Sequence, residues 1–167
     1  MAVLLDDVDL WLLTELEDDA DRPNVELARI VGLSPAATLK RVRRLKDEGV
    51  IKGIRARIDT ALVGFQLQVY VECSLSEHDD RANARFEDVV RRMPNIVRAD
   101  WVTGETDALL QVVARDVAEL QRILQILSSR AGASRILTLL RLQEIKPPTP
   151  LPRRRVGPPG SDVRSGL

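Results

Sequence analysis

The stretch Asn24–Leu45, which reads NVELARIVGLSPAATLKRVRRL, carries the strongest fold signal in this 167-residue chain. Apolar residues recur at helical spacing on both sides of Gly32, and glycine is suited to the left-handed end of a helix. Ser34 and Pro35 then supply an N-cap followed by proline at the first helical position, which is typical of a helix start. The stretch predicts two helices joined by a tight turn, with Asn24 as the N-cap of the first.

The outer face of the second of these helices predicts a surface that reads DNA. With Thr38, Val42 and Leu45 turned inward, small and basic side chains share the outer surface. Small residues let the backbone approach base edges, and long basic residues reach guanine acceptors or phosphates. The alternative is an ordinary three-helix core with a solvated basic face. The predicted DNA-binding residues are Ser34, Ala36, Ala37, Lys40, Arg41, Arg43 and Arg44.

Charge is distributed unevenly along the chain, although its formal net charge is zero. Residues 1–26 contain nine acids and one base, for a net charge of −8. Among these acids, Asp6 and Asp7 are suited to cap a helix, so a first helix is predicted to begin near them. Residues 29–57 contain nine bases and two acids, for a net charge of +7. A local basic excess of this size favours a surface that faces phosphates.

The second half of the chain predicts a separate α+β domain. Strand and helix patterns alternate in the order β-α-β-β-α-β, which is the ferredoxin-like arrangement with both helices on one face of the sheet. The other face is expected to be covered by a second copy of the chain, with Val69, Val71 and Leu139–Leu142 as candidates for the seam, although alternation alone leaves open which set of residues faces outward. The predicted strands are 66–73, 96–103, 108–114 and 135–145, and the predicted helices are 79–93 and 117–127.

Four segments are expected from these patterns. They are a helix-turn-helix DNA-binding domain at 1–49, a wing or linker at 50–63, a ligand-sensing and dimerisation domain at 64–146, and a Pro/Arg-rich tail at 147–167. Apolar and basic residues alternate after Gly49, which predicts a short hairpin or a linking strand in the second segment. The tail has six prolines in 21 residues, so we expect it to be extended or disordered.

The chain resembles the Lrp/AsnC family, the leucine-responsive or feast/famine regulators. The resemblance runs over roughly residues 4–146 and rests on the pattern Leu5-Asp6-x-x-Asp9-x-x-Leu12-Leu13-x-x-Leu16 and on the segments 24–28, 31–35, 41–45 and 49–51. It implies a winged helix-turn-helix followed by an ACT-like regulatory domain. It also implies double-stranded DNA and an amino-acid-like ligand as partners, and dimers that stack into larger rings such as an octamer.

The loop Thr103, Gly104, Glu105, Thr106 and Asp107 is the predicted effector-binding segment. It is similar to the family's small-molecule loop, although Ala108 stands where that family usually has tyrosine. Gly104 allows a turn that presents backbone N–H groups to a carboxylate, and Asp107 is suited to accept from an ammonium group. An ordinary hairpin turn is the alternative interpretation, because glycine and aspartate are common turn residues.

Other classes of function have little support in the sequence. One cysteine, Cys73, and one histidine, His78, give no zinc-binding cluster, and no phosphate-binding loop or nucleophile elbow is present. We therefore expect no metal, no cofactor apart from an amino-acid effector, and no enzymatic activity. No signal peptide or membrane-spanning run is visible, so a cytoplasmic location is expected. The alternatives are an architectural DNA-binding protein without an effector and an enzyme of the sirohaem-decarboxylase type.

Overall fold

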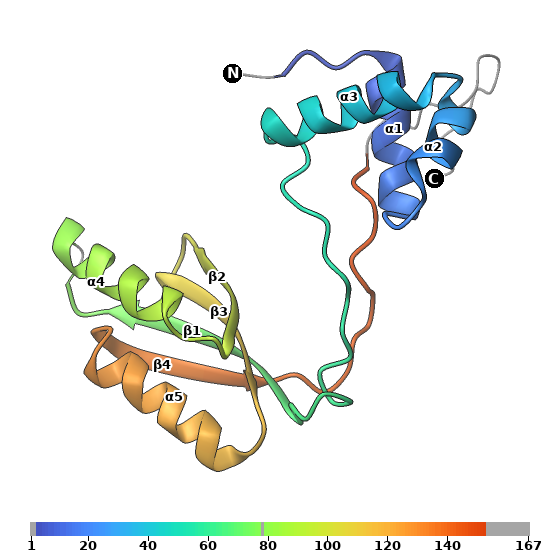
Figure 1. Ribbon diagram of the computed structural model, residues 1–167. Coiled ribbons are helices and arrows are strands. Elements are labelled where there is room, and N and C mark those ends of the chain that lie inside the picture. Colours follow the sequence, from blue (N-terminus) through green and yellow to red (C-terminus); the bar gives the residue numbers. More distant parts are fainter. Residues whose placement is uncertain (1–2, 78, 153–167) are drawn as a thin grey trace. The chain divides into compact units, whose positions relative to one another are not determined.

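The structure is a computed structural model that describes residues 3–77 and 79–152, and it forms two compact units (Figure 1). The first unit holds three helices in the residues up to Ala56 and also takes in the described segment from Pro147 onward, whereas the second spans Arg57–Lys146. The elements are α1 (Asp7–Asp18), α2 (Asn24–Val31), α3 (Pro35–Asp47), β1 (Leu67–Leu75), α4 (Asp80–Arg91), β2 (Ile96–Trp101), β3 (Ala108–Ala114), α5 (Val117–Ser129) and β4 (Ala133–Leu140).

The helix ends of the first unit follow local sequence chemistry. Asp6 caps α1, Gly32 ends α2 with a φ of +70°, and the hydroxyl of Ser34 accepts from the backbone N–H of Ala37 at the start of α3. The prediction that Asn24 caps α2 is wrong. Asn24 is the first residue of that helix, and its side-chain amide donates to the carbonyl of Pro35 at 2.9 Å. Asn24 therefore ties α2 to the start of α3.

Large aliphatic side chains from all three helices form the core of the first unit. Leu12 from α1, Leu27 from α2 and Val42 from α3 pack with Trp11 in one buried cluster, and Leu45 of α3 is also fully buried. Thr38 is also buried, and its hydroxyl donates to the carbonyl of Ser34 one turn earlier. This core fixes which side of α3 faces inward.

Residues 50–63 contain no strand, so the predicted hairpin does not form in this structure. The apolar alternation that suggested a hairpin leaves Ile54 and Ile58 exposed. A strand needs a hydrogen-bonding partner, and no neighbouring segment pairs with this one in the described structure.

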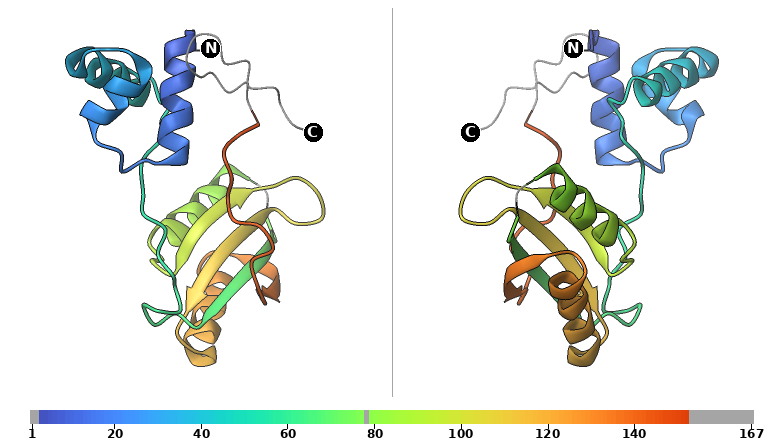
Figure 2. Two further views of the ribbon diagram at one scale, coloured as in Figure 1. Left: turned by 90° about the vertical axis from the view of Figure 1, so that its right-hand side faces the viewer. Right: turned by 90° about the vertical axis from the view of Figure 1, so that its left-hand side faces the viewer.

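The second unit is a four-stranded antiparallel sheet in the order β2-β3-β1-β4, as the ferredoxin-like pattern predicts. Helices α4 and α5 both lie against one face of this sheet (Figure 2). Val69 and Val71 point toward the helices and are buried, so the prediction that they form a seam between copies is wrong. The opposite face carries Leu139 of β4, which pairs with Tyr70 of β1 and is 45% exposed.

Strand β4 ends at Leu140, earlier than the predicted end at residue 145. Leu140 pairs with Val69, which lies two residues from the start of β1, so little of β1 remains for residues after Leu140 to pair with. Leu142 and Ile145 lie beyond the sheet and are exposed. The apolar alternation thus continues past the point where hydrogen bonding stops.

Cys73 of β1 is fully buried, and burial raises the pKa of its thiol to about 11, so it packs as a small apolar residue. Trp101 of β2 packs at the edge of this core. It is 46% exposed, its ring lies 5.2 Å from that of Phe86, and its indole N–H donates to Glu87. His78 and residues 153–167 of the predicted tail lie outside the described residues, and residues 147–152 form neither helix nor strand.

Candidate functional site

The outer face of α3 is a shallow hollow that combines small, apolar and basic side chains. Ala36, Lys40, Arg43 and Arg44 are exposed on it, as is Ser34 at the cap, whereas Ala37 and Arg41 are half-buried. The side chains that line the hollow are Ala36, Leu39, Lys40, Arg43, Arg44, Asp47 and Glu48. The core packing of Thr38, Val42 and Leu45 therefore presents most of the predicted DNA-binding residues to solvent.

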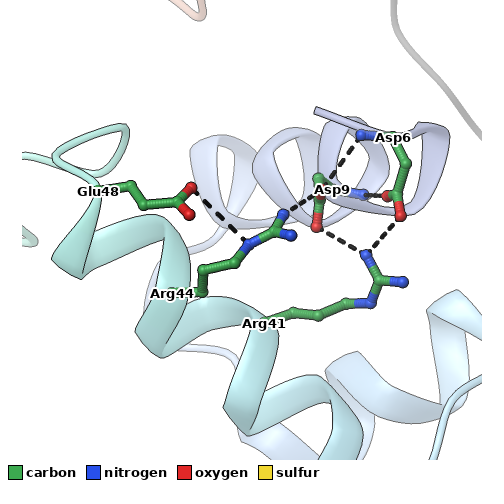
Figure 3. Close-up of polar contacts among 5 residues, drawn as sticks. All are labelled: Asp6, Asp9, Arg41, Arg44 and Glu48. Carbon is green, nitrogen blue, oxygen red and sulfur yellow. Dashed lines mark hydrogen bonds and ion pairs between the residues drawn. The ribbon is translucent and has the colours of Figure 1, made fainter. Parts of the chain in front are cut away.

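Arg41 and Arg44 do not extend freely into solvent, because both bind carboxylates of α1 (Figure 3). Arg41 Nη1 lies 2.9 Å from Asp9 Oδ1 and 2.7 Å from Asp6 Oδ2. Arg44 Nη2 donates to the other oxygen of Asp9, and its Nε lies 3.8 Å from Glu48 Oε2. We call Asp6, Asp9, Arg41 and Arg44 the α1–α3 clamp.

The clamp reinforces the cap of α1. Asp6 accepts from the backbone N–H of Asp9 at 2.8 Å, and Asp9 accepts in return from the backbone N–H of Asp6 at 3.2 Å. Desolvation acts to raise the pKa of the Asp6 carboxyl, but hydrogen bonds from Arg41 and the Asp9 backbone bring it below its ordinary value. The hydrogen bonds that Arg41 donates to the side chains of Asp6 and Asp9 raise the pKa of its guanidinium.

Lys40 and Arg43 have no carboxylate partner among the residues that the structure describes. Their charges are exposed on the outer face of α3, next to the small side chain of Ala36. Guanidinium and ammonium groups placed on an exposed helix are suited to phosphate oxygens and to the acceptors of guanine. The arrangement fits a surface that meets nucleic acid.

The predicted effector loop joins β2 to β3 and is held against the end of β1. Gly104 has a φ of +127°, so the turn uses backbone freedom that glycine supplies. The Thr106 hydroxyl and the Asp107 N–H both donate to the carbonyl of Cys73, at 2.9 and 3.0 Å. Asp107 Oδ2 accepts from the N–H of Leu75 at 2.7 Å. Asp107 therefore anchors the loop.

Two of the five predicted loop residues, Glu105 and Thr106, line a pocket of about 190 Å³. The other three, Thr103, Gly104 and Asp107, do not. The remaining walls come from the face of the sheet that the helices leave uncovered. They are Glu72 and Ser74 of β1 and Arg135 and Leu137 of β4.

These four residues were not predicted from the sequence, although a signal for them exists. Glu72 pairs with Leu137 and Ser74 pairs with Arg135, so alternation along two neighbouring strands places all four on one face. Finding them requires the register between β1 and β4. Carboxylates, a guanidinium and a leucine in one pocket complement a small zwitterion with an apolar side chain.

The described residues include no group of three or more His, Cys, Asp or Glu side chains placed to bind a metal ion. Among the helices that the structure describes, none has the length and apolar character that crossing a bilayer requires.

Comparison with known proteins agrees with both halves of this description. The sequence profile of a winged helix-turn-helix DNA-binding domain matches residues 5–52, and that of the Lrp/AsnC ligand binding domain matches residues 68–151. The chain belongs to the Lrp/AsnC family. The leucine-responsive regulatory protein of Rhizobium meliloti is 34% identical over 145 residues, which cover 86% of this chain and 93% of that relative.

Solved Lrp/AsnC structures share the architecture. A transcriptional regulator of Neisseria meningitidis, crystallised with L-methionine, is 33% identical, with a TM-score of 0.80 over 89% of this chain and 97% of its own. The feast or famine regulatory protein of M. tuberculosis, also in complex with L-methionine, is 32% identical, with a TM-score of 0.77 over 86% of this chain and 96% of its own. This Lrp/AsnC chain is therefore a transcriptional regulator with a DNA-binding domain followed by a ligand-binding domain.

Proposed function

We propose that this Lrp/AsnC regulator contacts DNA through the exposed face of α3, with Lys40 and Arg43 as its principal basic contacts. The observation that carries the proposal is that these two side chains are exposed and without carboxylate partners in the described structure, whereas Arg41 and Arg44 are bound to α1. Ser34, Ala36 and Ala37 lie at the start of the helix, where small side chains allow close approach to base edges.

The proposed effector is an amino acid, and the proposed site is the pocket beside the β2–β3 loop. Glu72 and Glu105 would bind its ammonium group, and Arg135 its carboxylate. Leu137 would contact the side chain. Two structures of similar proteins contain L-methionine, which makes that amino acid the first ligand to test.

Self-association is part of the proposal, because β1 and β4 present an apolar face that the helices do not cover. Leu137 and Leu139 are each 45% exposed there, and Tyr70 lies between them and β3. We propose a dimer through this face, with further stacking into rings such as an octamer. An effector pocket on the same face would then lie beside the seam, which supplies a route from ligand to assembly.

Binding to DNA tests the α3 assignment. Lys40→Ala and Arg43→Ala are compared with the wild type on a duplex that the protein selects from a random library and on a mixed-sequence duplex. A base contact should cost about 1–3 kcal/mol on the selected duplex alone, and a phosphate contact should weaken both duplexes and flatten the salt dependence. Arg122→Ala removes the same charge from an exposed position of α5 and serves as the control. Equal binding by all three variants would mean that α3 is not the reading helix.

Calorimetry with L-methionine, followed by the other amino acids, tests the effector site. Glu72→Gln and Arg135→Gln should each weaken binding at least tenfold, about 1.4 kcal/mol, because each removes one charge partner of the zwitterion. Arg130→Gln removes a guanidinium from the exposed end of α5, outside the pocket, and should bind normally. Unchanged affinity in both pocket variants would exclude this site, and binding of no amino acid by the wild type would favour an architectural protein without an effector.

A purely regulatory role in the cytoplasm completes the proposal. The similar proteins are named as regulators, and the pocket by the loop is lined by two acids, one base, two hydroxyl side chains and a leucine. An enzyme of the sirohaem-decarboxylase type is the alternative, and turnover of a decarboxylation substrate by the purified chain would support it.

A further inference from the structure

We infer that Asp9 is a specificity-determining residue for DNA binding, because it positions α3 and holds Arg41 and Arg44 away from DNA phosphates. The inference rests on the proposed role of α3 as the DNA-contacting helix. Asp9 itself lies on α1 and is buried. Its effect on DNA is therefore exerted through the two arginines that it binds.

In the described structure the side chain of Asp9 accepts three hydrogen bonds, and the two that come from Arg41 and Arg44 tie α3 to the start of α1. Its side chain is only 1% exposed, and it accepts from the N–H of Asp6, from Arg41 and from Arg44. A buried carboxylate depends on its hydrogen-bond donors, so separation of either arginine would remove a charge-assisted hydrogen bond that water cannot readily replace at this buried position. The two guanidinium groups are thus retained by α1 more firmly than a pair of exposed charges would be.

The retained arginines lie close enough to the outer face of α3 to matter for DNA. Arg44 is 42% exposed and lines the same hollow as Lys40 and Arg43, and Arg41 is 30% exposed. A guanidinium released from Asp9 would therefore be available beside the proposed DNA contacts. Figure 3 shows both side chains directed from α3 toward the carboxylates of α1.

Keeping the guanidinium groups of Arg41 and Arg44 from DNA phosphates should change the preference for the correct site over other sequences more than it changes the affinity for the correct site itself. Phosphate contacts supply most of the affinity that a protein has for any duplex, and each one contributes about 0.9 to the slope of log K against log salt. Base contacts supply discrimination between sequences. With Arg41 and Arg44 held in ion pairs by Asp9, and further paired with Asp6 and Glu48, general attraction is limited while Lys40 and Arg43 remain available to contact DNA.

The first test is Asp9→Asn in the full chain, with binding measured over a range of salt concentrations. The two probes are a mixed-sequence duplex and a duplex that the wild type selects from a random library. We expect the slope to steepen by about 0.9 for each arginine that turns to a phosphate, and the ratio of selected to mixed-sequence affinity to fall. Asp7→Asn is the matched control, since Asp7 is an exposed residue of the same helical turn with no ion pair in the described structure.

A second variant keeps the test decisive if Asp9→Asn fails to fold. Asp6→Asn retains an N-cap residue, because asparagine caps helices as well as aspartate does, but it removes one carboxylate from Arg41. It should steepen the slope by less than Asp9→Asn does, and Asp7→Asn should leave the slope unchanged.

The double variant Asp9→Asn with Arg44→Gln provides a readout that a merely structural role would not change. If the released arginine causes the steeper slope, its removal should return the slope toward that of the wild type. A wild-type slope in folded Asp9→Asn, or a flatter slope when Arg41→Gln and Arg44→Gln are made in the otherwise native chain, would overturn the inference. Failure of the α3 assignment gives a different result, in which Lys40→Ala and Arg43→Ala leave binding unchanged.

Discussion

The carboxylate of Asp107 accepts a hydrogen bond from the backbone N–H of Leu75, with 2.7 Å between the two heavy atoms. This bond closes the β2–β3 loop onto the end of β1, where the Asp107 N–H also meets the carbonyl of Cys73. Asp107 is therefore an anchor of the loop in this structure, and the charged groups around the neighbouring pocket are Glu72, Glu105 and Arg135.

Asp107→Ala should destabilise the second unit. The change leaves the N–H of Leu75 without its acceptor, and a hydrogen bond to a charged group contributes about 1.5–3 kcal/mol. Urea unfolding measures the effect, with Glu105→Ala as the control because Glu105 is exposed in the same loop. Equal stability of the two variants would show that the anchor contributes little.

Gly104→Val should also destabilise the protein, but through backbone strain. A side chain at Gly104 would meet no atom within 4 Å, so steric overlap with neighbouring groups is not the cause. The φ of +127° is one that residues with a Cβ rarely adopt, and holding it should cost about 1–3 kcal/mol. Gly53→Ala is the comparison, since Gly53 has open space and lacks a positive φ. A melting temperature unchanged by Gly104→Val would contradict this account.

Leu139→Asp should weaken self-association. The substitution places a charge on the uncovered face of the sheet, where a second copy would have to desolvate it. We expect the dimer dissociation constant, measured by sedimentation, to rise at least tenfold, about 1.4 kcal/mol. Leu142→Asp introduces the same charge at a more exposed leucine beyond the end of β4 and should leave the constant unchanged. A dimer that tolerates Leu139→Asp must use another surface.

The first unit should lose stability in acid through Asp6. Its pKa lies below the ordinary value of 3.8, so the folded state binds a proton less readily than the unfolded chain does. The contribution is fully present above pH 3.8 and is lost as the pH falls through the lowered pKa. The melting temperatures of wild type and Asp6→Asn should therefore become more similar as the pH falls. A difference in melting temperature that stays constant across this pH range would argue against the linkage.

Local rules were sufficient to predict the helices and the order of the strands. The helix caps depend on contacts within a few residues, as at Asp6, Gly32 and Ser34, so these caps can be predicted from the sequence. The prediction that Asn24 caps α2 failed because its side-chain amide donates instead to the carbonyl of Pro35, 11 residues away. The end of β4 was misplaced for a similar reason, since it depends on where β1 begins.

The sites were predicted less completely than the fold, because they depend on long-range geometry. A helical wheel places Arg44 outward, yet it carries no information about Asp9, which lies 35 residues away on another helix. In the same way, the pocket opposite α4 and α5 joins Ser74 to Arg135 through strand register. Residues close in sequence, such as Lys40 and Arg43, were placed correctly on the exposed face.

The α1–α3 clamp also changes what hydrogen exchange at the beginning of α1 measures. Helix ends usually fray, and their amide hydrogens exchange with solvent long before the rest of a domain opens. Here the amide of Asp9 donates to Asp6, and both carboxylates are bound to α3. To open this turn, the protein must release Arg41 as well. Hydrogen exchange at Asp9 should therefore follow the opening of the whole three-helix unit, which makes one amide a probe of its cooperativity.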